Sequence, residues 1–162
     1  MKRTFVYAMF ALATALVACG GGNSAGTDKT PAAESAKEEA KPNENPSYDP
    51  KRGEGKFTHV DVPPALNAAM AENGNKTYKL KCESCHKLTD EKLVGPGWKN
   101  VTQRHAAEWI MNFVTNTDEM LNKDPAAQAQ LEICLVRMPN QNLSDDEARA
   151  VYEFMRKNDG VK

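Results

Sequence analysis

From about residue 57 onward, apolar side chains recur at intervals of three and four residues, the spacing that places them on one face of an α-helix. This pattern predicts a helix over 66–81 and another over about 106–116. The apolar stripe of the second helix consists of Trp109, Ile110, Phe113 and Val114. Both stripes predict helices that bury one face against a common core.

Two later helices are predicted from their start signals. Asp124-Pro125 combines a favourable N-cap with proline at the first helical position, which predicts a helix over 124–135. Ser144 and Glu147 form a capping box, which predicts a helix over 144–157. Alternation between apolar and polar residues never persists beyond a few positions, so no strand is predicted. The sequence therefore predicts a small all-α domain without β-strands.

The first residues have a different pattern. Lys2 and Arg3 precede an apolar run over 5–18, which is typical of a secretory signal peptide and too short to span a membrane comfortably. The run ends in Leu16-Val17-Ala18-Cys19, which resembles the bacterial lipobox. That resemblance implies a signal peptide over 1–18, cleavage before Cys19 and lipidation of Cys19, which would anchor the protein to a membrane surface. An ordinary signal peptide that happens to end in cysteine and an uncleaved signal anchor are the alternatives.

Composition separates the signal peptide from the folded domain. Residues 19–56 are rich in Gly, Ala, Ser, Pro, Glu and Lys and show no apolar periodicity, so they cannot bury enough surface to offset the entropy of ordering them. We expect a lipid-anchored flexible tether over 19–56 and the folded domain over 57–162. The formal net charge of -1 argues against a nucleic-acid-binding protein, which would normally be basic.

The cysteines raise a question of chemistry. The chain has four, and lipidation of Cys19 would leave the close pair Cys82 and Cys85, followed by His86, and a distant Cys134. A structural zinc site needs four ligands, and a thiol–disulfide exchange motif normally opens a helix beside β-strands, whereas here a predicted helix leads into the motif. Cys134 is most simply a small buried apolar residue, and we assign it no role.

C-x-x-C-H is also the sequence pattern for covalent haem attachment, in which two thiols bond to the porphyrin and the histidine ligates iron. The predicted export signal favours this interpretation over zinc and disulfide exchange. A domain of roughly 100 residues, such as the one predicted over 57–162, buries only a modest fraction of its surface. A large apolar cofactor inside it would therefore stabilise it considerably.

Residues 66–162 resemble a class I c-type cytochrome. The resemblance includes Gly74 and Tyr78 before the haem motif, and Val151 and Phe154, which match the family's contact on the last helix. It implies an all-α cytochrome c fold around one covalent haem c, held by Cys82 and Cys85.

The same resemblance implies the ligands of the iron. Gly95-Pro96 is similar to a family turn in which the proline carbonyl orients the haem histidine, so Pro96 would orient His86. Met138, in a loop before the last helix and followed by proline, is expected to be the second axial ligand. The weaker candidates are Met120, His105 and His59.

Iron with both axial positions filled has no open position for a substrate, so the expected function is one-electron transfer by a carrier and not an enzyme. We expect redox partner proteins, namely a quinol-oxidising complex and a terminal reductase, on the periplasmic side of a membrane. The stretch 138–158 resembles small bacterial lipoprotein cytochromes that accompany respiratory reductases, nitrous-oxide reductase among them. A haem-based sensor or gas-binding protein with a labile sixth ligand is the alternative, and a peroxidase-type enzyme is disfavoured because it usually needs a second haem or a distal acid–base pair.

Charged residues indicate a docking surface for those partners. Acidic residues at 145–147 begin the last predicted helix. We expect the lysines near the haem motif to steer an acidic partner, although an ordinary solvated face would have the same composition. These lysines are Lys76, Lys79, Lys81, Lys87 and Lys92.

Overall fold

The computed structural model describes residues 48–162, so the predicted signal peptide, Cys19 and most of the predicted tether lie outside the described residues. The helices are Ala68–Lys81 (α1), Val101–Arg104 (α2), Ala107–Thr115 (α3), Thr117–Lys123 (α4), Pro125–Cys134 (α5) and Asp145–Asn158 (α6). No β-strand occurs within 48–162, and one isolated antiparallel bridge pairs His86 with Lys92. No helix in this part of the chain has the length and apolar character needed to cross a bilayer. The predicted all-α fold is therefore confirmed.

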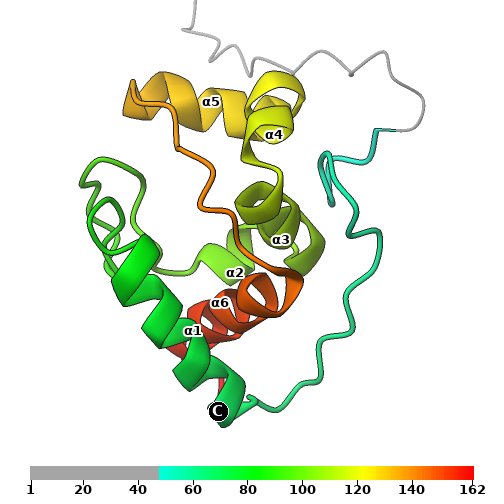
Figure 1. Cartoon of the computed structure of the whole chain (residues 1–162), viewed down its shortest axis with the longest axis vertical. Coiled ribbons are helices and arrows are strands. Elements are labelled where there is room, and N and C mark those ends of the chain that lie inside the picture. Colours follow the sequence, from blue (N-terminus) through cyan, green and yellow to red (C-terminus); the bar gives the residue numbers. More distant parts are fainter. Residues whose placement is uncertain (1–47) are drawn as a thin grey trace, which may run out of the picture. The chain divides into compact units, whose positions relative to one another are not determined.

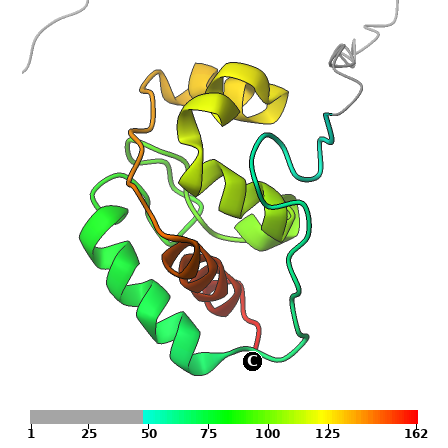
Figure 2. The ribbon, with the colours of Figure 1, turned by 45° about the vertical axis from the view of Figure 1, so that its right-hand side comes forward.

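Helices α1 and α6 form the largest packing contact of the domain (Figures 1 and 2). They cross at Gly74, where a Cβ atom would lie only 1.9 Å from the carbonyl oxygen of Ala150. The buried rings of Tyr78 and Phe154 pack beside the crossing, with centroids 5.4 Å apart. Glycine at this position therefore allows the two backbones to approach closely.

All four predicted helices are present, with ends within about two residues of the predicted ones. The predicted caps are also formed, because Asp124 accepts a hydrogen bond from the Ala127 N–H and Ser144 and Glu147 make the reciprocal capping box. Two short helices were not predicted. α2 buries none of its residues, and α4 buries only Thr117, Met120 and Leu121, so neither presents a periodic apolar stripe long enough to recognise.

An extended N-terminal strap, residues 48–67, runs along α3 and α4 to the start of α1 (Figure 1). Its Tyr48 hydroxyl donates to Asp124 at 2.6 Å. Buried Asn112 on α3 holds the strap through three hydrogen bonds: its Oδ1 accepts from the Phe57 N–H, and its Nδ2 donates to the carbonyls of Arg52 and Phe57. Within the described residues, contacts between the strap and the helices are already present at Tyr48, which lies in the predicted tether before Phe57.

A buried ion cluster fixes the other end of the strap. Glu153 of α6 is fully buried and accepts hydrogen bonds from Arg149, from Arg156 and from the Asn67 N–H. Arg156 also donates to the carbonyl oxygens of Pro63 and Pro64. These bonds satisfy main-chain groups that proline-rich backbone cannot pair in regular structure.

Candidate functional site

The C-x-x-C-H motif forms one tight turn at the end of α1. The Cys82 N–H caps the helix on the Tyr78 carbonyl, and the N–H groups of Cys85 and His86 both donate to the Cys82 carbonyl, at 3.0 and 2.9 Å. This turn keeps the two thiols and the imidazole within a few residues of the helix end. Burial raises the pKa of the Cys82 thiol to about 11, which outweighs the opposing effect of Lys81. A thiol that stays protonated at neutral pH is a poor nucleophile, so the site does not favour disulfide exchange.

The imidazole of His86 is held in one orientation. Its Nδ1 lies 2.9 Å from the carbonyl oxygen of Pro96. Because a carbonyl oxygen can only accept, Nδ1 carries the hydrogen and Nε2 keeps its lone pair. Burial lowers the pKa of His86 below 6.5 despite the Pro96 hydrogen bond, so the ring is neutral at neutral pH. The structure thus presents a neutral, oriented imidazole with Nε2 available as a ligand.

Packing on both sides restricts rotation of this imidazole. A Cβ atom at Gly95 would lie 2.3 Å from Cε1 of His86, and the ring of Trp98 packs with its centroid 5.5 Å from the imidazole. The buried Tyr78 hydroxyl donates to the His86 carbonyl at 2.7 Å. The ring and the backbone of His86 are therefore both fixed.

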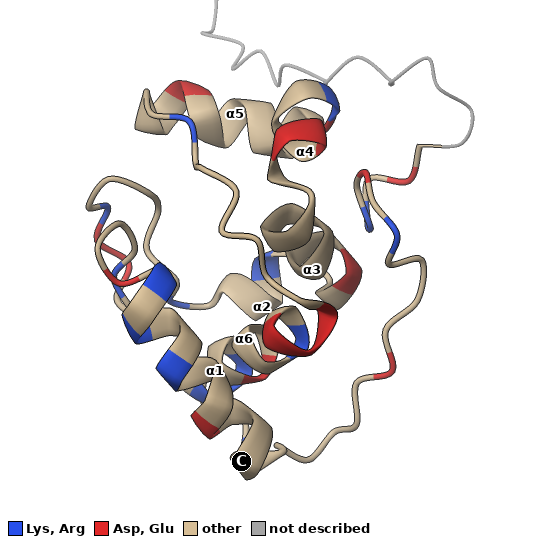
Figure 3. Cartoon of the chain, in the orientation of Figure 1, with Lys and Arg blue, Asp and Glu red and all other residues tan. Residues whose placement is uncertain are grey.

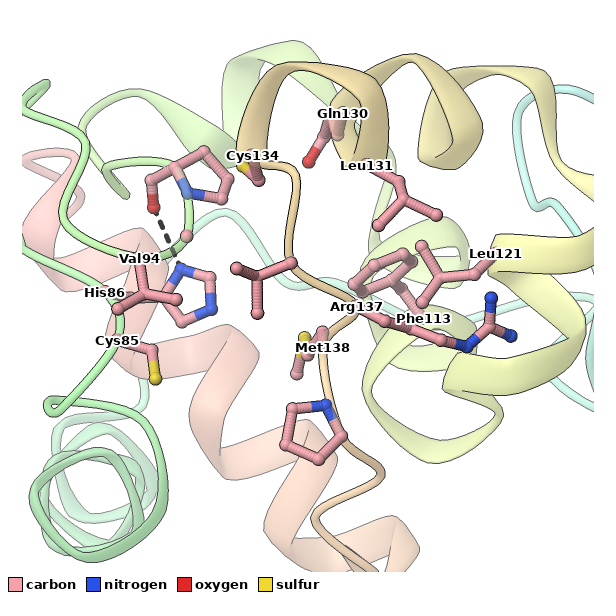
Figure 4. Close-up of a pocket in the computed structure, with 14 residues that line it drawn as sticks. Cys85, His86, Val94, Phe113, Leu121, Gln130, Leu131, Cys134, Arg137 and Met138 are labelled. Carbon is pink, nitrogen blue, oxygen red and sulfur yellow. Dashed lines mark hydrogen bonds between the residues drawn. The ribbon is translucent and has the colours of Figure 1, made fainter.

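Two apolar cavities of about 90 and 220 Å³ meet between the segment that follows α1 and the segment that follows α5. His86 and Met138 line both cavities, and Figure 4 shows their side chains approaching from opposite segments. Other residues shared by the two linings are Pro96, Phe113 and Gln130. Cys85 lines the smaller cavity, whereas Cys82 is buried in the turn and lines neither.

The weaker candidate ligands occupy other environments. Met120 is fully buried, and its sulfur accepts a hydrogen bond from the Glu54 N–H on the strap, on neither cavity's lining. His105 lines the larger cavity, but its ring stacks on Trp109 with a centroid distance of 3.9 Å. His59 is exposed on the strap. Of these three candidates, none presents an unobstructed donor opposite His86.

Several wall residues were not singled out from the sequence. Leu121 of the unpredicted α4 and Leu131 of α5 line the smaller cavity. Cys134, to which the sequence analysis assigned no role, lines it as well. Leu121 lies in a short polar stretch, so its sequence gave no periodic signal, whereas Phe113 was already part of a predicted apolar stripe. Within 48–162, no three side chains of His, Cys, Asp or Glu converge in a geometry that could hold a metal ion, which disfavours the zinc alternative.

The five lysines near the motif differ in their partners. Lys81 pairs with Glu147, Lys87 pairs with Glu91, and Lys92 donates to the Ile133 carbonyl. Lys76 and Lys79 are exposed on α1, and no ion-pair partner occurs for either among the described residues. Figure 3 shows basic residues along α1 and acidic residues at the start of α6.

Comparisons with known proteins agree with this geometry. A family model described as Cytochrome c matches residues 71–159. A solved cytochrome c from Rhodothermus marinus is similar, with a TM-score of 0.63 and 30% sequence identity over 65% of this chain and 90% of that chain. An engineered cytochrome c from the same organism matches over the same shares, with a TM-score of 0.62 and 28% identity. An engineered form described as bound to a carbene intermediate has a TM-score of 0.59 and 28% identity, again over the same shares. No curated protein sequence matches the chain.

The helical fold and the apolar cavities opposite His86 define an electron-transfer protein that carries haem c. The chain belongs to the cytochrome c family. Its cofactor is one covalently bound haem c, and the protein is an electron carrier. The residues present fit this group, since the cavity walls are largely apolar and an imidazole and a thioether face the same space.

Proposed function

We propose that the chain is a membrane-tethered monohaem cytochrome in which Cys82 and Cys85 form the thioether bonds and His86 and Met138 are the axial ligands. The observation that supports this most is that Met138 and the oriented His86 line the same two cavities. Haem c supplies reversible one-electron chemistry at its iron. With both axial positions taken by protein side chains, no position is open to a substrate.

The surrounding residues tune this carrier. Pro96 fixes the tautomer of His86 and increases the basicity of Nε2. A thioether ligand and apolar walls such as Phe113 and Leu121 both favour the reduced iron, because they stabilise its lower charge. The thioether and the apolar walls therefore raise the expected reduction potential relative to a site with a second nitrogen ligand and polar walls, and the basicity of Nε2 acts against them.

The partner surface that we propose centres on α1. Lys76 and Lys79 carry charge that no intramolecular ion pair offsets within the described residues, and Leu80 between them and the motif is 84% exposed. Lysines around an apolar centre fit an acidic redox partner. Charge reversal at Lys79 should slow electron transfer at low salt. The same reversal at Lys87 should have a smaller effect, because Glu91 already offsets that charge.

We further propose that Cys19 is lipidated and that the protein works at the periplasmic face of the cell envelope. There it would carry electrons from a quinol-oxidising complex to a terminal reductase, with nitrous-oxide reductase as one candidate. The support is the lipobox-like Leu16-Val17-Ala18-Cys19 and the haem-attachment motif in one chain. Metabolic labelling with a radioactive fatty acid should mark the protein, and Cys19→Ala should abolish both the label and membrane association.

Replacement of the sixth ligand tests the haem site. The oxidised protein should show the weak far-red absorption band of a thioether–iron bond, and Met138→Ala should remove it. Met70→Ala is the matched control, because Met70 is also half-buried but lies on α1, away from both cavities. A far-red band that survives in Met138→Ala would overturn the ligand assignment.

A haem-based sensor is the second candidate function, because Met138 is only half-buried and lies on an irregular loop. Rapid carbon monoxide binding to the reduced protein would favour the sensor. Slow or absent binding would favour the carrier, in which Met138 stays bound.

A further inference from the structure

The loop that carries Met138, residues 136–143, has few polar attachments. It begins after Leu135, which ends α5 in the left-handed conformation at φ 59°, and it ends at the α6 cap. Within 48–162, none of its residues makes a hydrogen bond between main-chain groups. Its hydrogen bonds from Gln141 to the Pro139 carbonyl and from the Asn142 N–H to Asn140 stay inside the loop.

Arg137 makes the one polar attachment of this loop to another element within the described residues. Its guanidinium donates to the Asp118 carboxylate at 3.3 and 3.4 Å, to the Asp118 carbonyl at 3.2 Å and to Asn122 Oδ1 at 2.9 Å. A planar guanidinium that meets three acceptors on one helix fixes direction as well as distance. Arg137 directly precedes Met138, so this attachment controls how the backbone enters the ligand position.

α4 is itself held in place by buried side chains, so an attachment to it restricts the position of the loop. Its Met120 is fully buried and bonded to the strap through the Glu54 N–H, and its Leu121 is buried and lines the smaller cavity beside Met138. Pro139, on the other side of Met138, restricts Met138 to extended conformations. The loop is therefore constrained on one side by proline and on the other by Arg137.

We propose that Arg137, with Asp118 and Asn122, is a positioning clamp that holds Met138 on the iron. This proposal rests on the proposed function, in which Met138 is the sixth ligand. The clamp is solvent-exposed, with side-chain accessibilities of 43% for Arg137 and 66% for Asp118, so it contributes little to overall folding. Its effect falls on the equilibrium between bound and released Met138, which a small free energy shifts measurably.

Imidazole binding to the oxidised haem protein measures this equilibrium, because imidazole takes the sixth position only when Met138 leaves. Arg137→Ala should increase imidazole affinity about fivefold, the effect of losing one exposed ion pair and its hydrogen bonds. Asp118→Ala should increase it by a smaller factor, because the Asp118 carbonyl and Asn122 Oδ1 still accept from Arg137. Arg137→Lys should recover part of the loss, since an ammonium keeps the charge without the planar geometry.

Glu119→Ala is the matched control. Glu119 neighbours Asp118 in the first turn of α4, so its loss removes the same charge at the same helix end, but it pairs with Lys123 and not with Arg137. Imidazole affinity in Glu119→Ala should equal that of the unaltered protein. Unchanged affinity in Arg137→Ala and Asp118→Ala, or an equal increase in Glu119→Ala, would overturn the clamp.

Met138→Ala separates failure of the clamp from failure of the proposed ligand. If Met138 is the ligand, Met138→Ala binds imidazole much more tightly than any clamp variant. If Met138→Ala and the unaltered protein bind imidazole equally, the ligand assignment is wrong and the clamp falls with it. If Met138→Ala binds imidazole more tightly but the clamp variants keep the imidazole affinity of the unaltered protein, the ligand assignment stands and the clamp alone is wrong.

Discussion

Gly74 of α1 lies against the backbone of Ala150 of α6 so closely that a Cβ atom would approach the Ala150 carbonyl oxygen to 1.9 Å. Gly74→Ala should therefore force the two helices apart. Alanine favours a helix by about 1 kcal/mol over glycine, but overpacking against rigid backbone costs more. We expect a net loss of about 2–4 kcal/mol in the free energy of unfolding, measured by denaturant titration of the haem protein.

Asn73→Ala provides the comparison for this prediction. Asn73 is exposed on the adjacent position of the same helix, so its replacement changes helix propensity without changing the crossing. Its free energy of unfolding should stay within about 0.5 kcal/mol of the unaltered protein. Equal stability of Gly74→Ala and Asn73→Ala would show that the crossing tolerates a methyl group.

Gly95 and His86 are in similarly close contact, since a Cβ at Gly95 would lie 2.3 Å from Cε1 of the imidazole. Gly95→Ala should tilt the ring and lengthen its hydrogen bond to the Pro96 carbonyl. We expect the electron paramagnetic resonance spectrum of the oxidised protein to change and about 1–3 kcal/mol of stability to be lost. Leu93→Ala, an exposed change two positions away on neither cavity's lining, should leave that spectrum unaltered.

Sequence patterns predicted the parts of the molecule that depend on local chemistry. The helices came from apolar periodicity and caps, and the turn of Cys82, Cys85 and His86 came from its spacing. The contacts of the strap were not predicted, because they are long-range hydrogen bonds, such as those of Asn112, which is separated from Phe57 by 55 positions. Main-chain groups carry most of that attachment, so the side chains of the strap contain no periodic signal.

The loop that carries Met138 was also predicted only in part from the sequence. Its methionine followed by proline was recognisable from the sequence, but the base on which the loop rests was not. That base is α4, whose seven residues bury too few side chains to predict a helix. The sequence therefore did not distinguish Arg137 from other exposed arginines. The structure shows that it donates to Asp118 and Asn122.

Removal of the Asn112 amide tests whether the strap is part of the folded domain. Asn112→Ala loses three hydrogen bonds and leaves partly buried main-chain groups of the strap unpaired, which should cost about 2–3 kcal/mol in the free energy of unfolding. The Phe57 amide should also exchange with solvent hydrogen much faster. Asn116→Ala, which loses a single bond of 3.3 Å to the Glu54 carbonyl, should cost far less. Equal costs would mean that the strap contributes little through Asn112.

The buried Glu153 should make the stability of the domain dependent on acid. Burial raises the pKa of this carboxyl, but hydrogen bonds from Arg149, Asn67 and Arg156 outweigh burial, so the pKa in the folded protein lies below the ordinary value of 4.5. A carboxyl whose pKa is lowered by folding stabilises the protein fully above its unfolded pKa, and that contribution is lost as the pH falls through the folded pKa. Glu153→Gln should lose about 3 kcal/mol near pH 7, because it leaves Arg156 buried without its charge partner. The difference in the free energy of unfolding between this variant and the unaltered protein should shrink as the pH falls below about 4.5 in denaturant titrations.

Glu132→Gln, an exposed change on α5, is the control and should have the same free energy of unfolding as the unaltered protein near pH 7. A constant difference in the free energy of unfolding between Glu153→Gln and the unaltered protein down to about pH 3 would contradict the assigned role of Glu153.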